Sequence, residues 1–172
     1  MEKTSTEAEA TVAAQKEVGA PPPEKKVILR SSDDEVFEVG LSAASQSVAI
    51  KNMIEDGYAD GGIFLFQVTG PVLAKVVEYW KKHAEGGGSS EELKKWDAEY
   101  ANMEKDLRFQ VIEAADYLDT QPLLDCLCQA VADTIENMSV EDCREYMGVE
   151  NDFTPEEEAE VRAKYSWAFE NP

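Results

Sequence analysis

The sequence predicts an α+β fold, in which a small sheet is followed by an array of helices. Two β-branched runs, Val27–Leu29 and Val36–Val39, flank the turn-forming cluster Ser31–Asp34, which is the pattern of a β-hairpin. After Val68, apolar residues recur at helical spacing and follow capping residues and prolines. Hydrophobic residues make up 43% of the chain, enough for a core, which excludes a fully disordered protein.

A short helix and a third strand complete the sheet half. Ser45 or Ser47 is placed to cap a helix that ends near Gly57. The apolar run at residues 63–68 then has the length of a buried strand. The predicted order is strand, strand, helix, strand.

Six helices are expected after this strand. One is indicated by the apolar stripe from Phe109 to Leu118 alone, and the other five begin at residues that cap helices or precede a proline. These five residues are Thr69, Ser89, Thr120, Ser139 and Thr154.

Two of the helices differ from ordinary surface helices. The apolar stripe from Leu123 to Ile135 is wider than packing on one side requires. The helix from Pro155 to Lys164 has only two alanines and one valine, which at about 25 cal/mol per Å² cannot offset its ordering cost. We therefore expect the aromatic end at residues 165–169 to fold back on the body or to be completed by another chain.

Composition narrows the function. The chain of 172 residues has 36 Asp and Glu against 16 Lys and Arg, a formal net charge of −20, which disfavours nucleic acid and anionic membranes as partners. Residues 1–25 are polar and are expected to form a flexible tail. Three cysteines, an odd number, and the lack of a signal-like or membrane-spanning run favour the nucleus and cytoplasm.

The sequence gives little support to catalysis, and we expect no enzyme, cofactor or metal. The one histidine, His83, follows two lysines at the end of a helix, where a surface cation is favoured. A Ser-His-Asp arrangement has no other histidine to use. Cys126 and Cys128 stand two apart on a helix and face different directions, so that with Cys143 they are expected to be reduced thiols.

Five segments in order resemble the S-phase kinase-associated protein 1 family, with an ending like that of plant members. They are VILRSSDDEVFEV, VLAKVVEYWKKH, WDAEY, EAADYLDTQPLLDCLCQAVADTIENMSVEDCREYM and NDFTPEEEAEVRAKYSWAFE. The resemblance implies a BTB/POZ domain over residues 26–119 and C-terminal F-box-binding helices over 120–172. It also implies a non-catalytic adaptor subunit of an SCF-type E3 ubiquitin ligase, which bridges F-box proteins to a cullin scaffold in a heteromeric complex for ubiquitin-dependent protein degradation.

The resemblance places the cullin-binding pair at Asp116 and Tyr117. Many members have Asn in place of Asp116, and an ionised carboxylate cannot donate the hydrogen bond that an amide can. The implied F-box-binding residues share an apolar character and fall on the last helices. They are Leu123, Leu124, Leu127, Cys128, Val131, Ile135, Met147, Val149, Phe153 and Trp167.

Departures from the family pattern leave alternatives open. The family's Phe-Asn-Ile-Lys run is Met-Gly-Val-Glu at residues 147–150, so that Glu150 puts a negative charge where members have a positive one. Residues 107–172 hold 16 acidic against four basic residues, which predicts an acidic rim around an apolar groove. The alternatives are a diverged BTB-type paralogue with restricted F-box partners and weak cullin binding, or a scaffold outside cullin ligases.

Overall fold

The computed structural model describes residues 25–86 and 89–168. The described chain contains β1 (Lys26–Arg30), β2 (Val36–Gly40), α1 (Leu41–Ala44), α2 (Val48–Glu55), β3 (Ile63–Phe64), α3 (Gly70–Ala84), α4 (Ser90–Ala101), α5 (Lys105–Tyr117), α6 (Gln121–Ile135), α7 (Val140–Met147), α8 (Pro155–Lys164) and the 3-10 helix η1 (Ser166–Ala168). The predicted α+β class is confirmed. The tail predicted at residues 1–25 lies outside the described residues, apart from Lys25. None of the helices over 25–86 and 89–168 is long and apolar enough to span a bilayer.

The predicted hairpin is confirmed. β1 pairs antiparallel with β2, and the sheet order is β2-β1-β3. Its turn is held by Ser31, a buried residue whose hydroxyl accepts from the amide of Glu35 at 3.0 Å. Asp34 takes the left-handed conformation that the turn needs, with φ at 68°.

The third strand is much shorter than predicted, so the strand expected over residues 63–68 is wrong in extent. β3 pairs in parallel with β1 only at Leu29 and Arg30. The chain then turns, because Leu65 and Val68, three residues apart, both enter the core, whereas Phe66 between them is 73% exposed. An apolar run with this spacing cannot alternate as a strand does.

The start of α3 is fixed from the hairpin turn. The Asp33 carboxylate accepts from the Gly70 amide at 2.7 Å and from the Ser31 hydroxyl at 2.5 Å, and these hydrogen bonds lower the pKa of Asp33. Thr69 stands at the predicted N-cap, but its side chain makes no capping bond. A Cβ at position 70 would meet the carboxylate end of the Glu35 side chain, which would have to move to make room for it.

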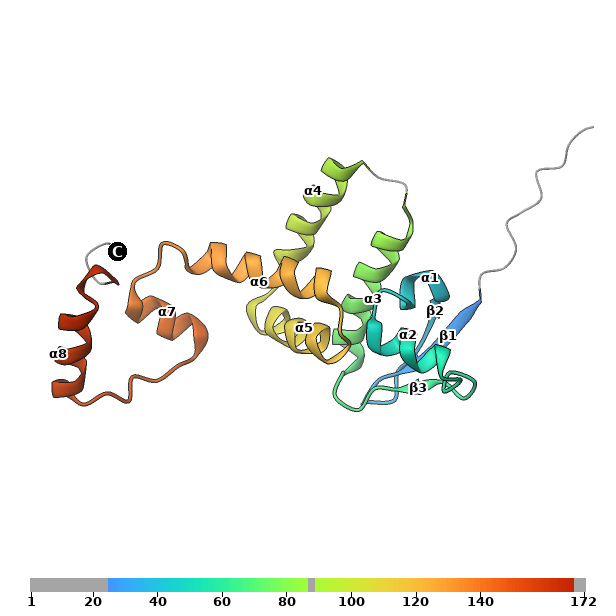
Figure 1. Ribbon diagram of the computed structural model, residues 1–172, viewed down its shortest axis with the longest axis horizontal. Coiled ribbons are helices and arrows are strands. Elements are labelled where there is room, and N and C mark those ends of the chain that lie inside the picture. The colour runs from blue at the N-terminus through green and yellow to red at the C-terminus, as the bar shows by residue number, and fades with distance from the viewer. Residues whose placement is uncertain (1–24, 87–88, 169–172) are drawn as a thin grey trace, which may run out of the picture.

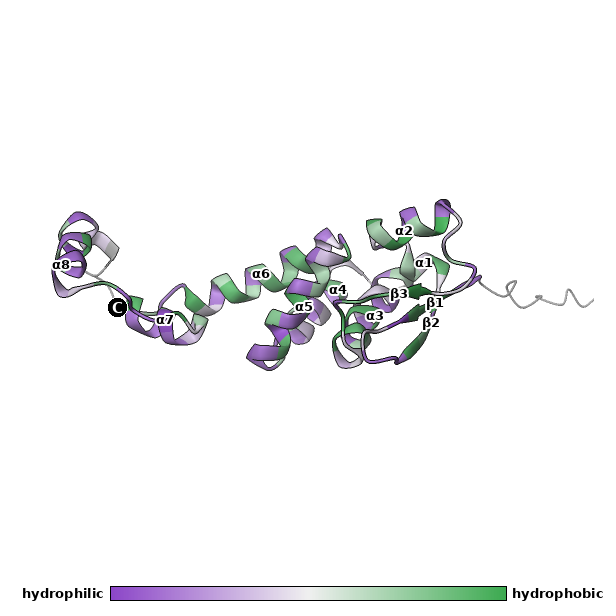
Figure 2. Cartoon of the chain, turned by 90° about the horizontal axis from the view of Figure 1, so that it is seen from below, coloured by the Kyte–Doolittle hydropathy of each residue, from purple (hydrophilic) through white to green (hydrophobic). Residues whose placement is uncertain are grey.

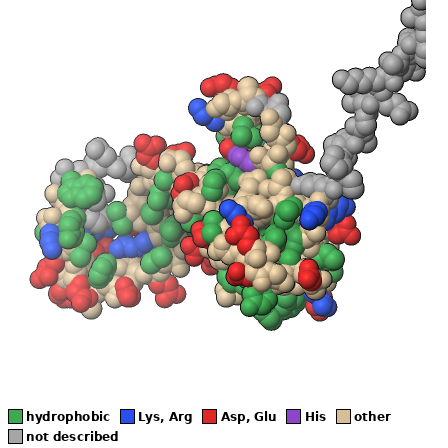
Figure 3. Space-filling view, turned by 45° about the vertical axis from the view of Figure 1, so that its right-hand side comes forward, with side chains coloured by type: hydrophobic (Ala, Val, Ile, Leu, Met, Phe, Trp, Pro, Cys, Tyr) green, Lys and Arg blue, Asp and Glu red, His purple; other side chains and the backbone are tan. Residues whose placement is uncertain are grey.

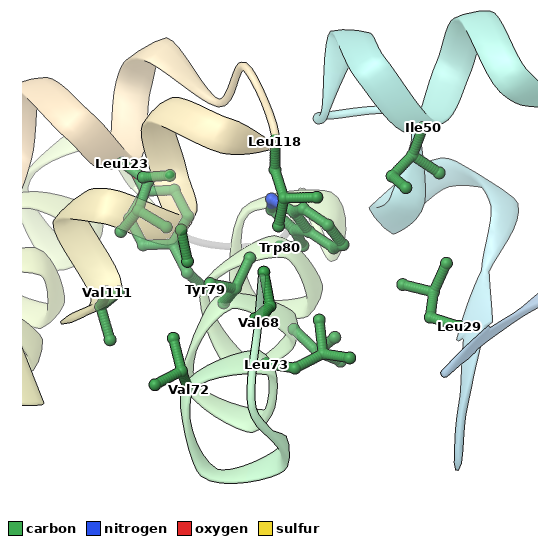
Figure 4. Packing of buried hydrophobic residues seen from close by; sticks show 14 of the residues in the cluster. Leu29, Ile50, Val68, Val72, Leu73, Tyr79, Trp80, Val111, Leu118 and Leu123 are labelled. Carbon is green, nitrogen blue, oxygen red and sulfur yellow. The ribbon is translucent and has the colours of Figure 1, made fainter. Parts of the chain in front are cut away.

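The core gathers around α3, as Figure 4 shows. Tyr79 and Trp80 are its largest fully buried side chains. The Trp80 indole donates to the Thr120 hydroxyl at 3.3 Å. The backbone carbonyl of Trp80 accepts from the side-chain amide of Gln46 at 2.6 Å. The hydroxyl expected to cap α6 therefore binds α3 instead.

His83 is not a simple surface residue, contrary to the prediction. Its ring stacks on Tyr79 with centroids 4.1 Å apart, and its Nε2 lies 2.7 Å from the Asp97 carboxylate. Trp96 and Tyr100 of α4 complete this aromatic cluster. The cluster holds α4 against the C-terminal half of α3.

The last helices extend beyond the body. In Figure 1, α7 and α8 lie at the far end of α6 from the sheet, and Figure 2 shows α8 as mainly hydrophilic. The α7–α8 segment buries no helical side chain. Tyr146 connects α7 to α5: its carbonyl accepts from Lys105 at 3.2 Å and its hydroxyl from Arg108 at 3.3 Å. Arg162 of α8 pairs with Glu141 of α7.

The caps predicted at Ser89, Ser139 and Thr154 are confirmed, and of the two serines offered for α2, Ser47 is the cap. Ser47 is fully buried, and its hydroxyl accepts from the Ile50 amide at 3.0 Å. The same hydroxyl donates to the Leu118 carbonyl at 2.5 Å, where α5 ends.

We predict that Ser47→Ala lowers the free energy of unfolding by about 2–3 kcal/mol. The substitution removes a helix cap, and it also leaves a buried carbonyl without its donor. Urea unfolding followed by circular dichroism measures the change. The matched control is Ser139→Ala, which removes a half-buried cap whose hydroxyl donates to the Asp142 side chain and not to a buried carbonyl, and it should cost about 1 kcal/mol or less. Equal effects of the two substitutions would contradict the role given to the Leu118 carbonyl.

Candidate protein-interaction surfaces

The wide apolar stripe of α6 divides into two faces. Leu123 and Leu127 have no exposed surface and belong to the core, in which Figure 4 labels Leu123. These two predicted F-box residues therefore pack inside the body and are not available to a partner. Four others, spaced i, i+4, i+7 and i+11, form the second face: Leu124, Cys128, Val131 and Ile135.

This second face is only partly covered. Leu124, Val131 and Ile135 are half-buried, and Cys128 is exposed. The helix thus contributes one face to the core and leaves its neighbour open along its length. Two faces on one helix account for the width of the stripe in the sequence.

An apolar groove of about 340 Å³ lies where α6 meets α7. It contains three of the predicted residues, Ile135, Met147 and Val149, of which Met147 is 45% and Val149 59% exposed. The other residues that line it are Met138, Ser139, Val140, Cys143 and Arg144. Six apolar side chains, Cys143 included, from two helices and their connections therefore form a floor with one cation beside it.

The sequence prediction missed Met138, Val140 and Cys143. The signal was present, because Val140, Cys143 and Met147 recur at i, i+3 and i+7 and so share one face of α7. The prediction relied on positions carried over from the family resemblance and did not follow this periodicity.

Phe153 and Trp167 lie outside the groove. The Phe153 ring is 44% exposed, and its centroid lies 6.0 Å from the Arg144 guanidinium carbon. Trp167 in η1 is 74% exposed. Figure 3 shows exposed hydrophobic side chains on this C-terminal arm with acidic side chains along its edge.

Asp116 and Tyr117 occupy the opposite end of the helical region, where α5 ends. Asp116 is exposed, and its carboxylate has no hydrogen-bond or ion-pair partner in the part of the chain that the structure describes. Tyr117 is half-buried and lines a shallow cleft of about 240 Å³. The cleft also includes Gln67, Thr69, Val72, Gln110 and Glu113, from the start of α3 and from α5.

The three cysteines are free thiols, and Cys126 contacts the Asp97 carbonyl at 3.9 Å. Burial and the nearby Asp97 raise the pKa of the Cys126 thiol to about 11, so the thiol is protonated at neutral pH. Within the described ranges, no three His, Cys, Asp or Glu side chains come together as a metal site.

Two family models match the chain. The Skp1 family tetramerisation domain, a POZ domain, matches residues 25–85, and the Skp1 family dimerisation domain matches residues 121–168. The first covers the sheet and α1–α3 and supports the BTB/POZ-like fold that the resemblance implied. The second covers α6–α8 and thus includes the groove.

Plant proteins are similar over nearly their whole length. SKP1-like protein 4 and SKP1-like protein 3 of Arabidopsis thaliana are each 46% identical over 158 residues, which is 85% of this chain and 97% of theirs. SKP1-like protein 1 of Oryza sativa subsp. japonica is 42% identical over 168 residues, 86% of this chain and 97% of the rice protein. On these matches the chain belongs to the Skp1 family, the adaptor subunits of SCF-type ubiquitin ligases.

Proposed function

We propose that this adaptor bridges F-box proteins, which bind α6–α8, to a cullin scaffold that contacts Asp116 and Tyr117. One observation carries the proposal: α7 and α8 bury no side chain of their own, while an apolar groove stands open between α6 and α7. Helices without a core of their own need a partner's apolar surface to be held in place. We place the complex in the nucleus and cytoplasm.

The groove suits an amphipathic helix of an F-box protein. Such helices insert apolar side chains spaced over one or two turns into a hydrophobic groove. Met147 can change its shape to fit different side chains, because its thioether chain has three rotatable bonds. Arg144 at the edge offers a hydrogen-bond donor for the polar side of the partner's helix.

The cullin contact is proposed at the cleft beside Tyr117. An aromatic ring that is half-buried at the wall of a shallow cleft supplies a large, rigid contact area at a low entropic cost. The exposed Asp116 carboxylate next to it can accept hydrogen bonds but cannot donate one.

We also propose that the adaptor has no catalytic activity. The His83 ring stacks on Tyr79 and bonds to Asp97 where α3 packs on α4, and the Cys126 thiol is held protonated, so the thiol is not poised as a nucleophile. The transfer of ubiquitin is left to other subunits of the ligase.

Val149→Glu should weaken the binding of an F-box domain about 10- to 100-fold. A buried valine is worth about 1.5–3 kcal/mol, and the substitution also puts an unpaired charge in the apolar groove. Isothermal titration with a recombinant F-box domain measures the affinity. Val36→Glu is the matched control, since Val36 is 62% exposed on β2, and its affinity should equal that of the unmodified protein. If the Val149→Glu variant binds as tightly as the control, the groove is not the F-box-binding site.

Asp116→Asn should strengthen the binding of a cullin N-terminal region about tenfold. The amide regains a donor and no charge has to be desolvated in the interface, which is worth about 1–3 kcal/mol. Biolayer interferometry gives the dissociation constant. Asp106→Asn makes the same chemical change in the first turn of α5 and should have no effect. If Asp116→Asn does not raise the cullin affinity, the missing hydrogen-bond donor at position 116 does not weaken cullin binding.

The rate of F-box association should fall several-fold between about 20 mM and 500 mM salt. Residues 107–172 carry 16 acidic and four basic side chains, and such a field steers basic surfaces only while it is unscreened. Stopped-flow fluorescence of the exposed Trp167 follows the association. A rate that does not change with salt would contradict the steering but not the groove.

A further inference from the structure

Sulfur-bearing side chains make up half of the apolar floor of the groove between α6 and α7. Met138, Cys143 and Met147 are three of its six apolar lining residues. The other two methionines in the described part of the chain, Met53 and Met103, pack against the hydrophobic core instead. Methionine and cysteine are the side chains that peroxides oxidise. The polarity of this groove can therefore change without a change in sequence.

The turn that ends α7 fixes Met147 at the groove. Gly148 takes the left-handed conformation, with φ at 68°, and the Val149 amide donates to the Arg144 carbonyl at 2.9 Å. These features form a Schellman motif, in which the residue after the glycine often contacts the last turn of the helix. Val149 and Cys143 accordingly line the same groove. Met147, the last residue of α7, is thereby held at the groove by the backbone on both sides of it.

Met147 is also the most accessible of the four methionines that the structure describes. It is exposed, whereas Met53, Met103 and Met138 are half-buried. A cysteine reacts as its thiolate, but a thioether has no proton to lose before it reacts. An oxidant dissolved in water therefore meets Met147 first among these four side chains.

We propose that Met147 is an oxidative modification site, and that its sulfoxide closes the groove to the apolar side chains of an F-box protein. A hydroperoxide transfers one oxygen to Met147 Sδ: the O–O bond breaks, an S–O bond forms, and hydrogen peroxide leaves as water. The sulfur loses two electrons and the peroxide gains them. A flexible apolar side chain becomes a polar, chiral one. The effect on F-box binding rests on the proposed function, whereas the oxidation site does not.

The sulfoxide opposes binding because a partner in the groove would bury its oxygen. An oxygen that leaves water without a donor costs free energy, and an apolar side chain offers no donor. Ser139 already donates to Asp142 at 2.7 Å. A bond to Arg144 would leave a polar pair where the partner's apolar side chain has to sit. A bound partner would in turn cover Met147 and shield it from the oxidant.

Peptide mass mapping of the free, full-length chain after treatment with hydrogen peroxide at about pH 7 tests the site. Dithiothreitol then reverses the sulfenic acid and disulfide products of the cysteines but leaves methionine sulfoxide in place. Met147 should gain oxygen at least about threefold faster than Met53, Met103 or Met138, since susceptibility follows exposure. A saturating F-box domain should slow the oxidation of Met147 and leave that of Met103 unchanged. If one of the other three methionines is oxidised first, the site is not Met147.

Isothermal titration with a recombinant F-box domain tests the effect on binding. Oxidation should lower the affinity at least about fivefold, and the two methionine sulfoxide reductases, one for each epimer, should restore it. Met147→Leu keeps an apolar side chain of similar volume and should bind equally well before and after peroxide. Met103→Leu, the matched control outside the groove, should remain sensitive.

An unchanged affinity after full conversion of Met147 to its sulfoxide would overturn the closing of the groove. A peroxide effect that survives both Met147→Leu and dithiothreitol would overturn the assignment to Met147. A reduced chain that binds no F-box domain would instead contradict the proposed function, and the order in which the methionines are oxidised would still decide the site.

Discussion

Burial of α3 is the constraint on which the rest of the structure depends. Its apolar side chains pack on both the sheet half and the helical half, and Tyr79 and Trp80 leave almost no surface exposed. The Trp80–Thr120 hydrogen bond then sets where α6 begins. Because α6 starts at that point, Leu123 and Leu127 enter the core and the adjacent face of α6 is left partly exposed. The placement of α6 thus determines both which of its residues complete the core and which remain exposed.

Most of the fold could be predicted from local chemistry. The hairpin turn, the helical stripes and the caps at Ser47, Ser89, Ser139 and Thr154 are each specified within a few residues, and the structure contains them. Thr69 and Thr120 make no side-chain capping bond. Two further predictions failed where distant segments decide the outcome. The run after Ile63 looks like a strand by its apolar content, but Leu65 and Val68, three residues apart, are both buried in the core. His83 looks like a surface cation until α4 brings Asp97 and an aromatic cluster against it.

The interaction surface was harder to predict than the fold. The wide apolar stripe indicates that α6 has two apolar faces. The sequence alone does not show which residues belong to the core, because Leu123 and Leu124 are neighbours and only the packing buries Leu123 fully. The contribution of Val140 and Cys143 was readable from their spacing. The burial of Arg108 could not be predicted, because only the folded structure brings the Tyr146 hydroxyl and the Met103 carbonyl to its guanidinium.

The exposed α7–α8 segment also has a thermodynamic consequence. Its helices are held to the body mainly through Tyr146, so their order contributes little to the folding of the free chain. A partner that occupies the groove would fix these helices in place, and the entropy lost in fixing them would reduce the binding free energy. The heat capacity change of association should accordingly be more negative than a rigid contact of the same area would give. If the proposed partners bind there, such an arrangement would let one adaptor fit partners of different shape, because each partner would order the segment as it binds.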